Sequence, residues 1–145
     1  MSIQTAAGTT LGVSAVLPAT QSSGGYAALT FTAVGEIVDN GSFGKTYNEV
    51  SFTALSDRRK RKFKGSYDVG SLQLQLGRDM ADAGQDVLRA ALESDNDYAF
   101  KVTLQNGEIT YFQAKVMSFQ TKVGSVDNIV GADCTLGINT DIIEV

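Results

Sequence analysis

Half of the basic side chains of this sequence are concentrated in one short stretch. Six of the twelve lysine and arginine residues lie between positions 58 and 64. Dense positive charge attracts anions, so the stretch suits a phosphate backbone or an acidic protein surface. A run of like charges is also common in solvated loops that bind nothing. The residues concerned are Arg58, Arg59, Lys60, Arg61, Lys62, Phe63 and Lys64.

The remainder of the chain carries the opposite charge. The whole sequence has a formal net charge of -4 and a pI of about 4.7. Outside residues 58–64, six basic side chains stand against sixteen acidic ones. A surface of this sign repels phosphate, which argues against nucleic-acid binding by the whole surface. We therefore expect one compact basic protrusion on a strongly acidic body.

The other residue types that carry chemistry favour a protein without an active site. There is no histidine, so neither a Ser-His-Asp nor a Cys-His site can be built from this chain. The single cysteine, Cys134, lies on the apolar side of an alternating run, which predicts a buried, inert thiol. Asp79, Asp82 and Asp86 could be taken for a metal or acid–base cluster, but their place around a helix start favours capping and dipole roles. We predict no catalytic residue, no metal site and no cofactor.

Length and composition indicate one folded domain spanning residues 1–145. The hydrophobic fraction is 43%, and proline occurs once, which is not the composition of a disordered chain. A single cysteine excludes an internal disulfide and suits a reducing cytoplasm. The N-terminus lacks the features of a signal peptide, and no segment approaches the roughly 20 apolar residues that span a bilayer. We expect no membrane partner.

The elements that must position the basic run are predicted to be mostly strands. Residues 67–77 form the clearest one, with leucine at every second position of its second half. Similar alternation predicts a last strand at residues 132–138 and a strand at 47–55 that leads directly into the basic run. A short strand is predicted at residues 11–15 and a further extended run at 26–38, with a loop at residues 19–25 between them.

A single amphipathic helix is predicted over residues 82–94. Asp82 is placed to cap its first turn, and Gln85 follows three residues later, as in a capping box. A lone amphipathic helix needs a sheet to cover. The side chains of its apolar stripe are Val87, Leu88, Ala91 and Leu92.

The dipeptide Asn106-Gly107 lies between two alternating runs, which predicts a β-hairpin with a two-residue turn. Regular pairing would place Leu104 opposite Ile109, and both faces of the pair would then carry apolar groups. One face would serve the core, and the other would need a second cover. A neighbouring subunit would supply it; alternatively, a β-bulge near Tyr111 and Phe112 would switch the register. We favour the subunit.

These elements predict a mainly β fold. It is an antiparallel β-sandwich or small barrel of seven or eight strands with one flanking α-helix. We expect flexible arms at residues 1–10 and 139–145. Residues 40–66 are expected to form a long excursion between strands that carries the basic run as a loop. Such an excursion is seldom without a role in a compact domain.

Five short segments form a specific pattern through their order and spacing. They are residues 31–37 (FTAVGEI), 49–57 (EVSFTALSD), 65–70 (GSYDVG), Gln85 with Leu88, and 100–107 (FKVTLQNG). Together they resemble the tail tube proteins (major tail proteins) of long, non-contractile-tailed bacteriophages. The resemblance covers most of the chain, from about Phe31 to the end.

The resemblance implies a structural subunit of the virion tail. Such subunits form hexameric rings that stack into a hollow tube, and phage DNA passes through the lumen without specific binding. The long loop and the terminal arms bridge adjacent rings, which would make Arg58–Lys64 an inter-ring contact. Further copies of the chain and the tape-measure, tail terminator and tail-tip proteins are the expected partners, and synthesis is expected in the host bacterial cytoplasm. Family members often carry an extra C-terminal immunoglobulin-like domain, which 145 residues cannot include.

Other classes of function remain open at this point. A tube protein of the secretion-system type would share the same fold. A nucleic-acid-binding module would use Arg58–Lys64, although Phe63 is the only aromatic residue in that run and the acidic remainder repels phosphate. A carbohydrate- or ligand-binding β-sandwich is disfavoured by the absence of tryptophan.

Overall fold

The computed structural model describes residues 3, 5–127 and 129–144. Over these residues the chain forms ten strands and two helices, so the predicted mainly β fold is confirmed. The strands are β1 (Thr10–Ser14), β2 (Thr32–Val34), β3 (Ile37–Asp39), β4 (Thr46–Thr53), β5 (Lys60–Asp68), β6 (Ser71–Gly77), β7 (Tyr98–Thr103), β8 (Ile109–Lys122), β9 (Gly131–Ile138) and β10 (Ile143–Glu144). The helices are α1 (Ser23–Ala27) and α2 (Ala83–Leu92).

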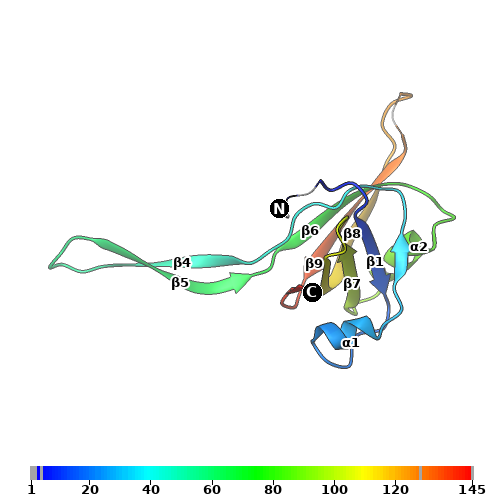
Figure 1. The fold of residues 1–145 in the computed structure, drawn as a ribbon. Helices are drawn as coiled ribbons and strands as arrows, with labels where there is room; N and C mark the ends of the chain where they lie inside the picture. The colour runs from blue at the N-terminus through cyan, green and yellow to red at the C-terminus, as the bar shows by residue number, and fades with distance from the viewer. Residues whose placement is uncertain (1–2, 4, 128, 145) are drawn as a thin grey trace.

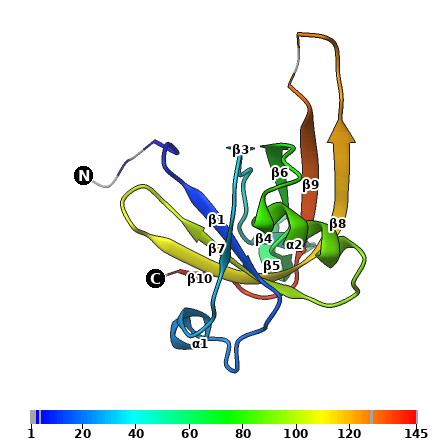
Figure 2. The ribbon, with the colours of Figure 1, turned by 90° about the vertical axis from the view of Figure 1, so that its right-hand side faces the viewer.

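Eight of these strands form one antiparallel sheet (Figures 1 and 2). Its order is β2-β1-β7-β8-β9-β6-β3, and β10 adds to β8. β2 and β3 stand at the two ends of this order, yet only Gly35 and Glu36 separate them in the chain. Glu36 has a φ of 60°, which marks a sharp kink between the two strands. The sheet therefore curls until its ends meet, which makes a small barrel, one of the two architectures that the sequence predicts.

Side chains from alternate strand positions fill the interior of this barrel. Leu72, Leu74 and Leu76 of β6 are buried, and their partners across the sheet are three buried residues of β9. α2 packs on β1, β2 and β8 and contributes Leu88 and Ala91 to the same core. Each fully buried leucine contributes about 1.5–3 kcal/mol to folding. The predicted helix and the last strand are thus confirmed. The strand predicted at residues 67–77 is confirmed only from Ser71, because Tyr67 and Asp68 belong to β5.

The hairpin turn at Asn106-Gly107 forms, but its register differs from the predicted one by one residue. Ile109 pairs with Thr103 and not with Leu104. The N–H of Gly107 donates to the carbonyl of Leu104, and Gly107 has a φ of 95°. These features describe a three-residue loop, whose last position requires the left-handed conformation that glycine adopts easily. The prediction of a two-residue turn was wrong.

The corrected register decides which apolar residues face the core. Phe112 stacks on Phe100 inside the barrel, with ring centroids 5.6 Å apart. Tyr111 lies on the other face, where Tyr26 of α1 stacks on it at 5.1 Å and Ile143 of β10 packs nearby. The chain therefore covers this second face with its own segments. The predicted cover by a neighbouring subunit was wrong, and no β-bulge near Tyr111 is needed.

The short helix α1 interrupts a region that was predicted as a loop at residues 19–25 and one extended run at 26–38. Its first turn is capped by Ser22, whose hydroxyl accepts from the N–H of Gly25. Tyr26 is completely buried. A helix that contains two glycines has poor intrinsic propensity, so burial of the tyrosine holds it in place. Such tertiary stabilisation leaves no periodic pattern in five residues.

The two predicted terminal arms are described only in part. Residues 1, 2 and 4 of the N-terminal arm and residue 145 of the C-terminal arm lie outside the described residues. Thr10 already belongs to β1, and β10 pairs antiparallel with β8 at Thr110 and Tyr111. The end of the predicted C-terminal arm thus pairs with a strand of the barrel. The flexibility of both arms stays a prediction.

Candidate assembly surfaces

The β4–β5 hairpin projects from the barrel as a long arm (Figure 1). The two strands form a sheet of their own, separate from the barrel. Arg58 and Arg59 lie in the turn, whereas Lys60–Lys64 begin β5. The strand predicted at residues 47–55 corresponds to β4, but the basic run was wrongly predicted as a loop. Pairing with β4 satisfies backbone groups that a loop would leave to water.

Cross-strand pairing divides the hairpin into two unlike faces. Val50 pairs with Phe63 and Phe52 pairs with Arg61, so these four side chains share one face. The three apolar ones are 52% (Val50), 56% (Phe63) and 54% (Phe52) exposed. We call Val50, Phe52 and Phe63 the apolar face of the hairpin.

The opposite face carries the lysines of the basic run. Its pairs are Glu49 with Lys64, Ser51 with Lys62, and Thr53 with Lys60. The Nζ of Lys62 lies 4.0 Å from a carboxylate oxygen of Glu49, and that of Lys64 lies 5.0 Å from the centre of the Tyr47 ring. Exposed contacts of this kind contribute at most about 1 kcal/mol each, so the lysines stay available for a partner. We call Lys60, Lys62 and Lys64 the lysine face.

The tip of the hairpin is an ordered turn. The Arg61 guanidinium donates to Asp57 at 2.9 Å, and the N–H of Arg59 donates to the same carboxylate at 3.2 Å. These two hydrogen bonds lower the pKa of Asp57, and the bond from Arg61 has the larger effect. Arg58 adopts a φ of 55°, and Leu55 is fully exposed. The tip therefore presents arginines and one leucine to solvent in a defined geometry.

At its base, the hairpin is tied to the segment that precedes β10. The hydroxyl of Tyr67 donates to Asp141 at 2.9 Å, and the Nζ of Lys45 lies 3.9 Å from the same carboxylate. The hydrogen bond to Asp141 is the main reason that the pKa of Tyr67 is raised. The rings of Tyr47 and Tyr67 lie 5.3 Å apart. These contacts connect the direction of the arm to the C-terminal segment.

A second, shorter projection is formed by the outer ends of β8 and β9. In Figure 2 these two strands extend past the rest of the barrel. The described residues of their connecting loop expose several aliphatic side chains, an unusual concentration for a surface loop. They are Val123, Val126, Ile129 and Val130.

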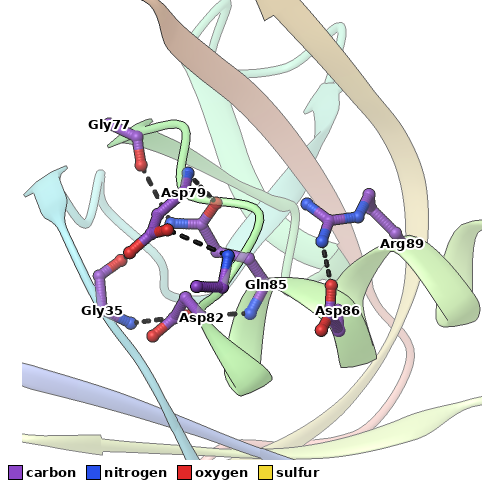
Figure 3. Close-up of polar contacts among 8 residues, drawn as sticks. Gly35, Gly77, Asp79, Asp82, Gln85, Asp86 and Arg89 are labelled. Atoms are coloured by element: carbon purple, nitrogen blue, oxygen red, sulfur yellow. Dashed lines mark hydrogen bonds and ion pairs between the residues drawn. The ribbon is translucent and has the colours of Figure 1, made fainter.

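The aspartate cluster has a structural role at the start of α2 (Figure 3). Asp82 accepts from the N–H of Gln85 at 3.0 Å and from the N–H of Gly35 at 3.1 Å. Asp86 pairs with Arg89 one turn further along the helix. The predicted capping role of Asp82 is therefore confirmed. Within the part of the chain that the structure describes, no group of three or more acidic, cysteine or histidine side chains could hold a metal ion.

Gln85 has a different role from the one that a capping box predicts. Its side chain is fully buried and points away from the cap. The Nε2 group donates to the carbonyls of Gly77 and Gly35 at 2.9 and 3.2 Å, and Oε1 accepts from the N–H of Asp79 at 3.0 Å. It thereby ties the kink between β2 and β3 to the end of β6. The capping-box prediction was wrong, because the buried backbone groups compete successfully for this side chain.

Two further expectations concern thiol reactivity and the membrane. Cys134 of β9 is buried, as predicted, and burial raises the pKa of its thiol to about 12. A protonated, enclosed thiol is a poor nucleophile. Neither of the helices in the described residues has the length and apolar character that would span a bilayer.

The sequence interpretation missed the apolar face of the hairpin. Val50 and Phe52 stand out as an alternating pair in the sequence, and Phe63 stands alone among charges. The three side chains share a face only because of the pairing register of β4 and β5. The sequence between these strands contains no short turn motif that would predict this register. The available signal was that lysine recurs at every second position from 60 to 64, which places Phe63 on the face without lysines if the run is a strand.

Solved structures with a similar fold cover nearly all of the chain. A chain of the sixfold-symmetrised anti-feeding prophage (AFP) baseplate aligns with a TM-score of 0.68 and 11% identity, covering 100% of this chain and 97% of the other. A chain of the sheath/tube terminator of the extracellular contractile injection system PVC in its extended state gives 0.69 and 10%, with coverages of 100% and 98%. The SPP1 tail tube gives 0.64 and 14%, with coverages of 94% and 75%. At such identities the likeness establishes the fold.

Comparison with family models identifies the chain more specifically. A search of curated protein sequences finds no match. The model described as phage tail tube protein, TTP, matches residues 5–143, which is nearly the whole sequence. The match includes the barrel, both helices and the projecting hairpin. The chain therefore belongs to the phage tail tube protein family.

Proposed function

We propose that this protein is the structural subunit of a phage tail tube, in which hexameric rings stack into a channel that delivers DNA into the host. The observation that carries the proposal is the projecting β4–β5 hairpin, a long exposed arm with one apolar and one basic face. A single chain gives this arm nothing to bind, whereas a polymer of copies does. The sixfold symmetry of the AFP baseplate, whose chain shares this fold, supports the ring.

In this proposal the hairpin bridges adjacent rings, and Arg58–Lys64 lie at the contact. Residues 46–68 contain six basic and three acidic side chains, a net charge of +3. All other residues together contain six basic and thirteen acidic ones, a net charge of -7. The arm of one copy is therefore attracted to the body of the next. Electrostatic complementarity of this kind sets orientation and speeds encounter.

The acidic body also suits the passage of DNA. A lumen lined by negative charge repels phosphate, so the genome slides through without adhering. The proposal includes no enzymatic activity and no cofactor. Its partners are further copies of the chain and the tape-measure, tail terminator and tail-tip proteins of a long, non-contractile virion tail, with synthesis in the host cytoplasm. The likeness to the SPP1 tail tube supports the tail, and the family match supports the tube.

Electron microscopy of the purified protein in negative stain tests this proposal directly. We expect hollow tubes, or rings with sixfold symmetry. Replacing Arg58, Arg59, Lys60, Arg61 and Lys62 by serine should leave the circular dichroism spectrum unchanged and slow tube growth. Deleting residues 1–8 should weaken stacking without unfolding the barrel. A protein that stays monomeric at all concentrations, salts and temperatures tried would contradict the proposal.

A second candidate function, binding of nucleic acid by Arg58–Lys64, is favoured by the exposure of the lysine face. It predicts micromolar binding of duplex DNA that weakens steeply with salt, since each neutralised phosphate releases counterions. Fluorescence anisotropy with a labelled duplex distinguishes the two functions. The tube proposal expects no binding at physiological salt, because the net charge of the chain is -4.

A further inference from the structure

The apolar face of the hairpin lacks a cover in the isolated chain. Val50, Phe52 and Phe63 are each more than half exposed, although they lie side by side on one surface. A two-stranded hairpin has no interior of its own and is at best marginally stable in water. Three large apolar side chains on one side of such an arm are typical of a surface that a partner buries.

The charge on this face is already neutralised within the hairpin. Arg61 is the basic side chain that shares the face with Val50, Phe52 and Phe63, and its guanidinium is bound to Asp57 at 2.9 Å. An arginine paired in this way can enter an interface with less loss of hydration than an unpaired one. The face is thus compatible with burial along its whole length.

The lysine face has the opposite properties. Lysine has a flexible stem and a strongly hydrated charge, and it is depleted from the buried centres of interfaces, where phenylalanine is enriched. Lys60, Lys62 and Lys64 project from the side of the hairpin that does not carry Val50, Phe52 and Phe63. Their charges act over a distance, so they can guide the arm without being buried.

The occupant of the apolar face is decided by charge. Two hairpins would each bring a net charge of +3 and repel one another. The remainder of a second copy carries -7 and attracts the arm. A body of this kind is thus a better partner for the hairpin than another hairpin is.

We propose that the hairpin binds the body of a second copy through Val50, Phe52 and Phe63, while Lys60, Lys62 and Lys64 remain in solvent and steer the encounter. This assignment rests on the proposed tube function and specifies which side of the arm holds the copies together. The basic run itself therefore contributes to the rate of assembly, and the aromatic residues beside it contribute the affinity.

Single cysteines on neighbouring residues test the assignment. Val50→Cys and Ser51→Cys place a thiol on opposite faces at adjacent positions of β4. Each variant is assembled as a minority component with wild-type protein, so that the wild-type copies determine the tube. The rate at which a maleimide alkylates the introduced thiol is then measured in the monomer and in the tube. Native Cys134 is buried in every copy, so it contributes only a slow background rate.

We expect assembly to slow alkylation of Val50→Cys by at least about tenfold and that of Ser51→Cys by less than about twofold, as the centre and the rim of an interface differ in water access. Protection of Ser51→Cys alone, of both variants equally or of neither would overturn the assignment. Tube formation by the wild-type protein is checked before any labelling. If no tube forms, the proposed function itself fails, and this failure is distinct from a failure of the face assignment.

Paired substitutions provide a second measurement. Phe52→Ser with Phe63→Ser removes the aromatic rings of the apolar face, and Lys60→Ser with Lys62→Ser is the matched control on the lysine face. The aromatic pair should raise the critical concentration for tube formation at least about tenfold at about 0.5 M NaCl, where surface charges are largely screened. The lysine pair should change it less than about threefold. The reverse order, or equal effects, would contradict the inference.

Discussion

At the scale of single residues, the environment decides roles that residue type leaves open. Asp82 caps α2, as its position before an apolar stripe indicates. Gln85, three residues later, instead satisfies buried backbone groups of three segments. A sequence shows that a glutamine follows a cap, but it does not show that a strand kink approaches from fifty residues away. The local contact was therefore predictable, and the long-range one was not.

The role of Gln85 predicts a large loss of stability when its amide is removed. Gln85→Leu leaves two carbonyls and one N–H without partners in a buried site, so the free energy of unfolding should fall by about 3 kcal/mol. Urea unfolding followed by circular dichroism measures the change. Gln73→Leu is the matched control, because Gln73 is exposed on β6, and it should change stability by less than about 0.5 kcal/mol. Equal effects of the two variants would show that the buried amide is not needed.

The buried thiol of Cys134 predicts a specific pH dependence. Its pKa is about 12 in the folded protein and 9.0 without burial, so the folded state keeps a proton that the unfolded state loses between these values. The contribution is fully present below pH 9 and is lost as pH rises toward 12, by up to about 1.4 kcal/mol per pH unit. The free energy of unfolding of wild type should therefore fall more steeply between pH 9 and 10.5 than that of Cys134→Ala. Parallel slopes would show that the thiol does not contribute.

At the scale of elements, hydrophobic alternation predicted the strands better than their partners. β6, β9 and α2 follow from periodic residues, because each buries one side against a core. The β7–β8 register was missed because Asn106-Gly107 is compatible with both two- and three-residue loops, and one residue exchanges the faces of Tyr111 and Phe112. The basic run was assigned to a loop because charge suggested exposure; the strand is exposed, yet it is paired.

The separate sheet of β4 and β5 predicts that the barrel folds without the hairpin. Replacing residues 46–68 by a short glycine–serine linker removes the exposed contacts of Tyr67 with Asp141 and with Lys45, which contribute about 1 kcal/mol or less each. The melting temperature of the remaining protein should fall by no more than a few degrees. Assembly should be lost completely, as judged by sedimentation. An unfolded product would show that the hairpin is part of the folding unit.

At the scale of the whole molecule, charge is divided between the arm and the body in a way that composition alone conceals. A net charge of -4 suggests a uniformly acidic protein, but it is the sum of a hairpin at +3 and a remainder at -7. Copies therefore repel at long range and attract when an arm approaches a body. Which effect governs assembly depends on the distance over which salt screens the charges.

This competition predicts that tube growth is fastest at intermediate salt. At about 0.01 M the screening length is about 30 Å, so the net charges of whole subunits repel; at about 0.1 M it is about 10 Å, and only the local attraction of arm and body survives. At about 0.5 M that attraction is screened as well, and the growth rate measured by light scattering should fall several-fold from its maximum. The critical concentration should change much less over the same range, because the apolar face supplies the affinity.

The control is the variant with serine in place of Arg58, Arg59, Lys60, Arg61 and Lys62. Its growth rate should rise steadily with salt, since only repulsion remains to be screened. A wild-type rate that also rises steadily would mean that the arm does not steer assembly.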